Sequence, residues 1–286
     1  MIVIAVTGAS GQLGRLVVEA LLKSKTETRI AALVRDPSKV ADFGEKGVDV
    51  RKADYDAPET LAAALEGVER LLLISSSEVG QRTRQHKAAI DAAKAAGVKL
   101  IAYTSILNAD DSPLALADEH RETEAYLEES GVPYVLLRHG WYTENYMGAI
   151  PAAVENGAVY GCAGDGRFSF ATRKDYAEAD AAVLLKEGQA GKVYELAGAR
   201  GYTLSELAAE ISAHANKTIP YVNIPEAAYS DALVKAGIPE PFAAILANSE
   251  TGASGGALFT KSHDLSDLIG RSSTTLAESV AVAMQD

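Results

Sequence analysis

The chain has 286 residues, 48% of them hydrophobic and 23% charged, and a formal net charge of −12 at pH 7. This balance is typical of a globular protein with one large domain or two small ones. Nucleic acid is excluded as an expected partner because its binding needs clustered positive charge, and the lysines and arginines are scattered. No apolar run reaches the roughly 18 residues that span a bilayer, so we expect a cytoplasmic protein without membrane insertion.

The first predicted elements are a strand, a glycine turn and a helix. Residues 2–6 form a continuous apolar run, which is typical of a parallel strand covered on both faces. Glycines then recur at a spacing of three, and a helical pattern starts near residue 12. Such a turn lets a dinucleotide pyrophosphate approach the N-terminus of the helix. We therefore predict that this turn binds the cofactor through Gly8, Ser10, Gly11, Gln12, Leu13 and Gly14.

Strands and helices are expected to alternate through the rest of the first half. The apolar runs that predict strands are 30–34, 48–51, 70–75, 100–104 and 134–137. Helical spacing is found between them at 58–66, 82–96 and 117–130, with Gly97 and Gly131 as helix stops. This alternation predicts an α/β protein with a doubly wound parallel sheet of the Rossmann type.

The pattern changes after residue 138. We expect a dinucleotide-binding domain over 1–138 and a smaller mixed α/β region over 139–286 that covers the cofactor. A helix over 174–186 belongs to this second region, whereas a strand at 192–196 can rejoin the first sheet and make the second region discontinuous. Thr203 and Glu206 have the spacing of a capping box, a helix-start device without chemistry.

The residues after the second strand bear on the choice of cofactor. Arg35 comes directly after the strand, where a guanidinium pairs with the 2′-phosphate of NADPH. Asp36, in front of Pro37, is interpreted as a turn or helix cap. We therefore favour NADPH and leave NADH open, and the alternative is that Arg35 is an ordinary surface residue.

Further polar residues follow the third, fourth and fifth strands, at the edge where ligands of such sheets bind. Asp54 has the right position to accept a hydrogen bond from the adenine amino group, but a turn aspartate is an equal alternative. Small hydroxyl residues after the fourth strand leave room for the nicotinamide half, and the alternative is that they form an ordinary loop. The predicted cofactor set is completed by Tyr55, Ser75, Ser76, Ser77, Tyr103, Thr104 and Ser105.

A catalytic acid is harder to predict. None of the 12 tyrosines has a lysine four residues later, the pair that lowers a phenol pKa in short-chain dehydrogenases. His120, which shares a helix face with Glu124, is the candidate proton donor, and the alternative is that it only hydrogen-bonds its neighbours. Planar substrates prefer aromatic walls, so we predict acceptor contacts from Trp141, Tyr142, Asn145 and Tyr146, with core filling as the alternative.

Several of these stretches together carry a resemblance. The segments 6–14, 53–55, 72–80, 102–105, 117–124 and 137–146 resemble the NmrA-like atypical short-chain dehydrogenases and, within them, the bacterial quinone oxidoreductases of type 2. The resemblance implies hydride transfer from NADPH to a quinone without flavin or metal. The chain departs from it at His139, where asparagine is expected. A reductase of triphenylmethane dyes and an NADP-binding sensor that regulates a protein partner stay open, as does a homodimer.

Overall fold

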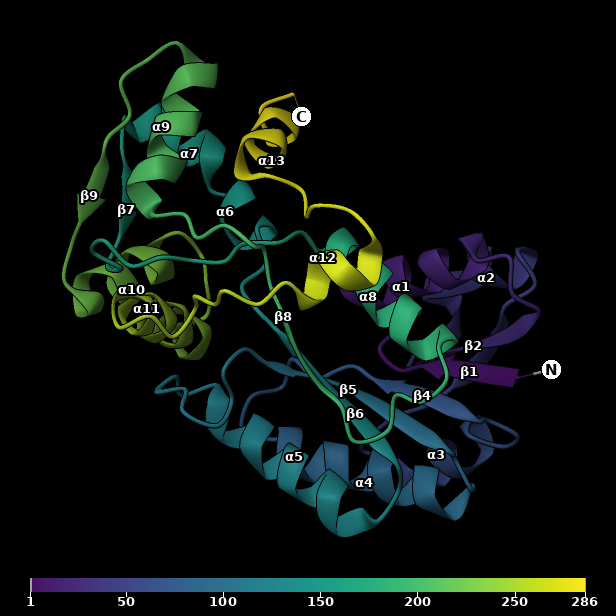
Figure 1. Ribbon diagram of the computed structural model, residues 1–286. Coiled ribbons are helices and arrows are strands. Elements are labelled where there is room, and N and C mark those ends of the chain that lie inside the picture. The colour runs from purple at the N-terminus through teal and green to yellow at the C-terminus, as the bar shows by residue number, and fades with distance from the viewer. Residues whose placement is uncertain (1, 286) are drawn as a thin grey trace. The chain divides into compact units, whose positions relative to one another are not determined.

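The computed structural model describes residues 2–285, and its main feature is a seven-stranded sheet in the order β3-β2-β1-β4-β5-β6-β8 (Figure 1). The order reverses between β1 and β4, which is the switch point where doubly wound sheets bind ligands. Every pairing from β3 through β6 is parallel. The strands are β1 (Ile2–Val6), β2 (Thr28–Val34), β3 (Asp49–Lys52), β4 (Arg70–Leu73), β5 (Leu100–Ile106), β6 (Tyr134–His139) and β8 (Val193–Leu196).

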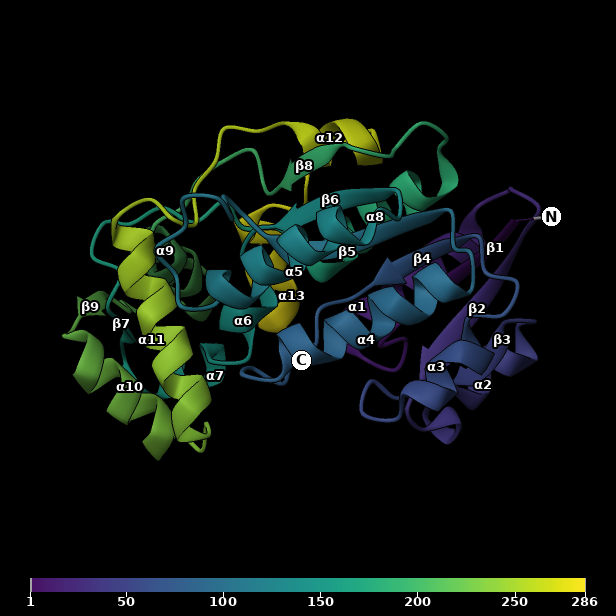
Figure 2. The same cartoon turned by 90° about the horizontal axis from the view of Figure 1, so that it is seen from below.

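Helices cover both faces of this sheet, and the predicted doubly wound fold is thereby confirmed. The helices α3 (Pro58–Ala64), α4 (Arg82–Ala95) and α5 (Ala117–Ser130) lie together on one face (Figure 2). On the other face α1 (Gln12–Lys23) packs along α8 (Arg173–Leu185). After β2 come a short 3-10 helix (Pro37–Val40) and α2 (Ala41–Glu45). Gly97 and Gly131 end α4 and α5 at positive φ, as predicted.

The core on the α3–α5 face explains why the apolar runs became strands. Leu71 and Leu73 of β4 are fully buried against Ile90 of α4, and Leu127 of α5 belongs to the same cluster. Apolar surface removed from water contributes about 25 cal/mol per Å², so strands without polar positions are stable only between two layers of helices.

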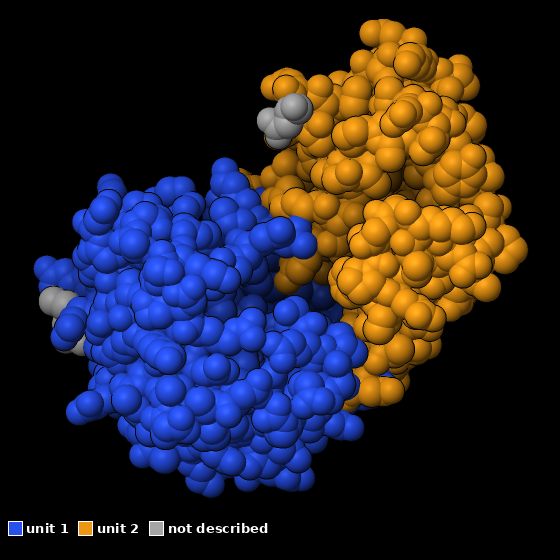
Figure 3. Space-filling view, turned by 180° about the vertical axis from the view of Figure 1, so that it is seen from behind, with its two compact units in different colours: residues 1–109, 119–139, 173–194 blue, residues 110–118, 140–172, 195–286 orange. Residues whose placement is uncertain are grey.

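The chain divides into two compact units (Figure 3). Unit 1 comprises residues 1–109, 119–139 and 173–194, and unit 2 comprises 110–118, 140–172 and 195–286. Helix α8 therefore lies in unit 1, whereas the sequence analysis placed it in the second region. The reason is its alanine-rich surface, including Ala177 and Ala179, which is buried against the first sheet and α1.

Unit 2 is built around a two-stranded parallel sheet, β7 (Val159–Gly161) with β9 (Tyr221–Asn223). The predicted capping box of Thr203 with Glu206 is present, and a second capping box joins Thr275 with Glu278. Within residues 2–285 no helix has the length and apolar character that crossing a membrane requires. The helices of this unit are α6 (Glu144–Met147), α7 (Ile150–Asn156), α9 (Leu204–Ala215), α10 (Glu226–Lys235), α11 (Glu240–Ser254), α12 (Asp264–Ile269) and α13 (Leu276–Ala283).

Candidate functional site

The glycine turn joins β1 to α1 in a conformation that only small residues allow. Gly8 has a φ of +58°, and the amide of Gly11 donates to the carbonyl oxygen of Gly8 at 2.8 Å. A Cβ on Gly14 would lie 2.4 Å from that same oxygen. The helix therefore starts in direct contact with the turn.

The start of α1 fits an anionic ligand. Gly11 is the N-cap and supplies no side-chain cap, and the first turn holds no acidic residue. Among residues 2–285 no acceptor is found for the first-turn amides of Gln12, Leu13 and Gly14. Unsatisfied amides and the helix dipole together favour a phosphate at this place.

Arg35 lies at the end of β2 with its side chain 68% exposed. Asp36 caps the short 3-10 helix, because its carboxylate accepts from the Ser38 amide at 3.0 Å, so the predicted capping role is confirmed. The Arg35 guanidinium donates a hydrogen bond to Glu78 Oε1 at 2.8 Å. Glu78, on the loop after β4, is a residue that the sequence analysis did not single out.

Asp54 and Tyr55 follow β3. The Asp54 carboxylate accepts from the Asp56 amide at 3.0 Å, which is the turn interaction given above as the alternative. Tyr55 reaches toward the carbonyl oxygen of Ile74, at 3.4 Å, and burial raises its pKa to about 12. Tyr55 therefore lies beside the loop that follows β4.

The serines after β4 are held by side chains from β5 and α4. The Ser75 amide donates to Thr104 Oγ1 at 2.9 Å, and the Ser76 amide donates to His86 Nε2 at 3.0 Å. Ser77 is exposed. This loop thus has a defined backbone with small side chains, which suits close approach of a ligand.

His86, which sequence reasoning missed, is the buried support of that loop. Its Nε2 accepts from Ser76, so in the neutral ring Nδ1 carries the hydrogen and donates to Thr123 Oγ1 at 2.9 Å. Burial, followed by the charge of Arg82, lowers the pKa of His86 to about 3. The signal in the sequence that could have identified His86 was its position, one turn after Arg82 on the helix that follows the serines.

His120 lies near Arg82 and Tyr103, inside unit 1. Its Nδ1 lies 2.7 Å from the Tyr103 hydroxyl, and its Nε2 lies 3.4 Å from Arg82 Nη1. Burial and the Arg82 charge hold the pKa of His120 well below its usual range. The imidazole is neutral at pH 7 and both nitrogens have neighbours, so the geometry favours the alternative of a hydrogen-bonded structural histidine.

All three predicted cofactor residues on β5 are buried, namely Tyr103, Thr104 and Ser105. The Tyr103 side chain is fully buried, and Ser105 is 4% exposed and donates to Glu124. Glu124 forms a buried ion pair with Arg138, 2.6 Å between Oε2 and Nη2. The Tyr103 and Ser105 side chains thus contact neighbouring protein groups, and their predicted role in cofactor binding stays a prediction.

His139, the departure from the resemblance, has a structural explanation. Its Nε2 lies 2.9 Å from Asp180 Oδ1, and its ring stacks on Tyr176 at 4.6 Å. Asp180 and Tyr176 both belong to α8 and are fully buried. His139 therefore joins β6 to α8.

The predicted acceptor residues lie in unit 2. Trp141 is buried, Tyr142 is half-buried and Asn145 is exposed. Tyr146 packs edge-on against Phe168 and Phe170 and donates to Glu250 Oε1 at 2.9 Å. The four are split between core and surface.

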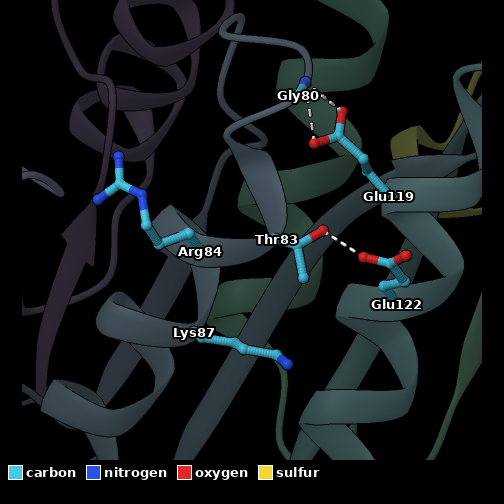
Figure 4. Close-up of a pocket in the computed structure, with 6 residues that line it drawn as sticks. All are labelled: Gly80, Thr83, Arg84, Lys87, Glu119 and Glu122. Atoms are coloured by element: carbon cyan, nitrogen blue, oxygen red, sulfur yellow. Dashed lines mark hydrogen bonds between the residues drawn. The ribbon is translucent and has the colours of Figure 1, made fainter.

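A hollow of about 600 Å³ opens in unit 1 beside α4 and α5 (Figure 4). Its polar groups largely pair with each other: Glu119 accepts from the Gly80 amide at 3.0 Å, and Thr83 donates to Glu122 at 2.6 Å. No predicted cofactor residue lines it. In the described part of the chain no cluster of three or more histidine, cysteine or acidic residues is arranged to hold a metal.

Comparisons with known proteins bear on this site. Quinone oxidoreductase 2 of Escherichia coli K12 is 55% identical over 278 residues, 97% of each chain. The crystal structure of the E. coli NADPH-dependent quinone oxidoreductase in complex with NADPH has a TM-score of 0.95, with 54% identity over 98% of this chain and 99% of that one. The Citrobacter triphenylmethane reductase complexed with NADP(H) has a TM-score of 0.93, with 39% identity over 98% and 99%.

The family model of the NmrA-like family matches residues 2–278, which includes the glycine turn, the serine loop after β4 and the aromatic segment 141–146. The resemblance inferred from the motifs is thereby confirmed, and the chain belongs to the NmrA-like family.

Proposed function

We propose that this protein transfers a hydride from NADPH to a quinone. The observation that carries the proposal is the 55% identity, over 97% of the chain, to a protein named quinone oxidoreductase. At the site itself, the support comes from the turn at Gly8–Gly14, whose free amides suit a pyrophosphate, and from the exposed cation of Arg35. NADPH supplies the hydride when it is bound, and the protein supplies binding, orientation and electrostatics.

Different residues of unit 1 bind different parts of NADPH in this proposal. The first-turn amides of α1 hold the pyrophosphate, Arg35 holds the 2′-phosphate, and Ser75 with Ser77 lines the nicotinamide side. His86 acts indirectly, because it fixes the backbone of the serine loop through Ser76. Catalysis in this proposal is mainly positioning.

A dedicated acid is not part of the proposal. A quinone is a strong hydride acceptor, so its oxygens can take protons from water after transfer. His120 is a poor donor, because its neutral ring already has neighbours at both nitrogens. We retain Trp141, Tyr142, Asn145 and Tyr146 as proposed acceptor contacts, with the half-buried Tyr142 and exposed Asn145 as the accessible pair.

The test is steady-state oxidation of NADPH with a series of quinones, beside calorimetric binding of NADPH and NADH. We expect that the flavin-free protein oxidises NADPH when a quinone is present. Tight NADPH binding without turnover on any acceptor would contradict the proposal and favour a sensor. The substitution Arg35→Ala should weaken binding of NADPH far more than binding of NADH. Equal losses of affinity for the two nucleotides would rule out the phosphate role of Arg35.

A second acceptor class has its own support. The likeness to a triphenylmethane reductase, at 39% identity, favours triphenylmethane dyes as substrates beside quinones. Ratios of kcat/KM for a quinone and for such a dye decide which class is preferred.

We also propose that the protein is cytoplasmic, a location to which its single cysteine is suited. Light scattering tests whether it forms a homodimer.

A further inference from the structure

The ion pair between Arg35 and Glu78 spans the strand that carries the glycine turn. Arg35 follows β2 and Glu78 lies on the loop after β4, and β1 lies between these two strands. The turn touches both sides: the Ala9 amide donates to the Leu33 carbonyl of β2, and a Cβ on Gly8 would meet Ile74 at 3.9 Å. The pair is therefore at the mouth of the proposed nucleotide site.

Glu78 is held in this position from behind. Its Oε2 accepts from Gln85 Nε2 at 2.8 Å, and its amide donates to Ser76 Oγ at 3.1 Å. Gln85 is only 2% exposed, so it fixes the carboxylate from the protein interior. The other oxygen, Oε1, is the one that faces Arg35. Two protein contacts thus orient Glu78 independently of the ion pair.

Arg35 is the cation that the proposed function gives to the 2′-phosphate. That phosphate carries about −1.5 to −2 charges at pH 7, taking the value for protein phosphate esters. A carboxylate already on the guanidinium must then be displaced or must share it with a second anion. The 2′-hydroxyl of NADH is uncharged, so it does not compete with the Glu78 carboxylate for the guanidinium.

We propose that Glu78 competes with the 2′-phosphate for Arg35 and so limits the preference of this protein for NADPH over NADH. The inference rests on the proposed function. Glu78 is a specificity-determining residue here, and it takes no part in hydride transfer. Its removal should strengthen binding of 2′-phosphorylated ligands and leave other ligands unchanged.

Calorimetric titration of Glu78→Gln with two nucleotides tests this without turnover. Adenosine 2′,5′-bisphosphate carries the phosphate in question, and 5′-AMP lacks it. We expect roughly two- to fivefold tighter binding of the bisphosphate, the range for release of an exposed ion pair, and unchanged binding of 5′-AMP. NADPH and NADH should follow the same division. Thermal melting checks that the variant is folded.

Glu69→Gln is the matched control. Glu69 pairs with Lys99 at 2.6 Å and precedes β4, at the opposite end of the strand from Glu78. It changes the net charge equally and should leave both affinities unchanged. A gain as large as that of Glu78→Gln would show a general charge effect and overturn the inference.

A double-mutant cycle with Arg35→Ala separates competition from simple repulsion. If Glu78 acts by occupying Arg35, its substitution should improve bisphosphate binding much less in the Arg35→Ala background. Equal improvement in both backgrounds overturns the competition. Unchanged or weaker bisphosphate binding by Glu78→Gln overturns the inference alone, whereas a wild-type chain that binds neither NADPH nor the bisphosphate overturns the proposed function as well.

Discussion

Substitution of Gly14 by alanine tests whether the contact between α1 and the glycine turn is as tight as the structure indicates. The added Cβ would lie 2.4 Å from the Gly8 carbonyl oxygen and 2.8 Å from Ala9 Cα, both backbone atoms. Backbone cannot rotate away as a side chain can, so the helix start or the turn must move.

The expected cost follows from two opposing terms. Overpacking costs about 1–3 kcal/mol, while alanine in place of glycine within a helix stabilises by about 1 kcal/mol. We expect a net loss of about 0–2 kcal/mol in the free energy of unfolding, or roughly 0–8 °C in Tm. Displacing the first-turn amides should also weaken NADPH binding by about tenfold, the loss of one hydrogen bond to a charged group.

The assay is urea and thermal unfolding beside calorimetric NADPH titration. Gly44→Ala is the control, because Gly44 lies in α2 and its Cβ would meet nothing within 4 Å. That variant should be more stable than wild type by about 0.4–1 kcal/mol and bind NADPH normally. If Gly14→Ala matched it in both measurements, the close contact at the turn would be refuted.

Three further predictions concern buried and titratable groups. Glu124→Ala leaves Arg138 buried without its carboxylate and should cost about 3–5 kcal/mol in urea unfolding; a loss below about 1 kcal/mol would contradict this. The lowered pKa values of His86, about 3, and of His120 mean that the unfolded chain binds more protons below its pKa of about 6.5. Stability should therefore be full above pH 6.5 and fall as the pH drops toward 3, by up to about 1.4 kcal/mol per pH unit for each histidine, with a shallower slope in His86→Gln; equal slopes would refute the His86 contribution. Burial raises the pKa of Cys162 to about 12, so at pH 8 iodoacetamide should label it more slowly in the folded than in the unfolded protein, and equal rates would argue against a shielded thiol.

The features predicted best are those that depend on neighbours in the chain. The glycine turn, the Asp36 cap, the helix stops at Gly97 and Gly131 and the Thr203 capping box all appear as expected. Each involves contacts within a few residues, so the local sequence specifies it. The strand assignments were also close, because a run of apolar residues is stable only when both of its faces are covered.

The candidate site shows what such patterns miss. Tyr103, Thr104 and Ser105 all follow the strand pattern into the core, and no local signal shows that Thr104 is the one that supports the Ser75 amide. His86 and Glu78 belong to the site through partners 10 and 43 residues away, respectively.

The sequence by itself determined the alternation of strands and helices in the first half of the chain, the glycine turn and the family, because these depend on local spacing and short motifs. Only the tertiary structure decided which side chains meet: Arg35 with Glu78, Ser76 with His86, and His139 with Asp180. The physical reason is that such pairs form where separate strands and helices come together in the fold. The local sequence around one residue of a pair therefore does not indicate which residue is its partner.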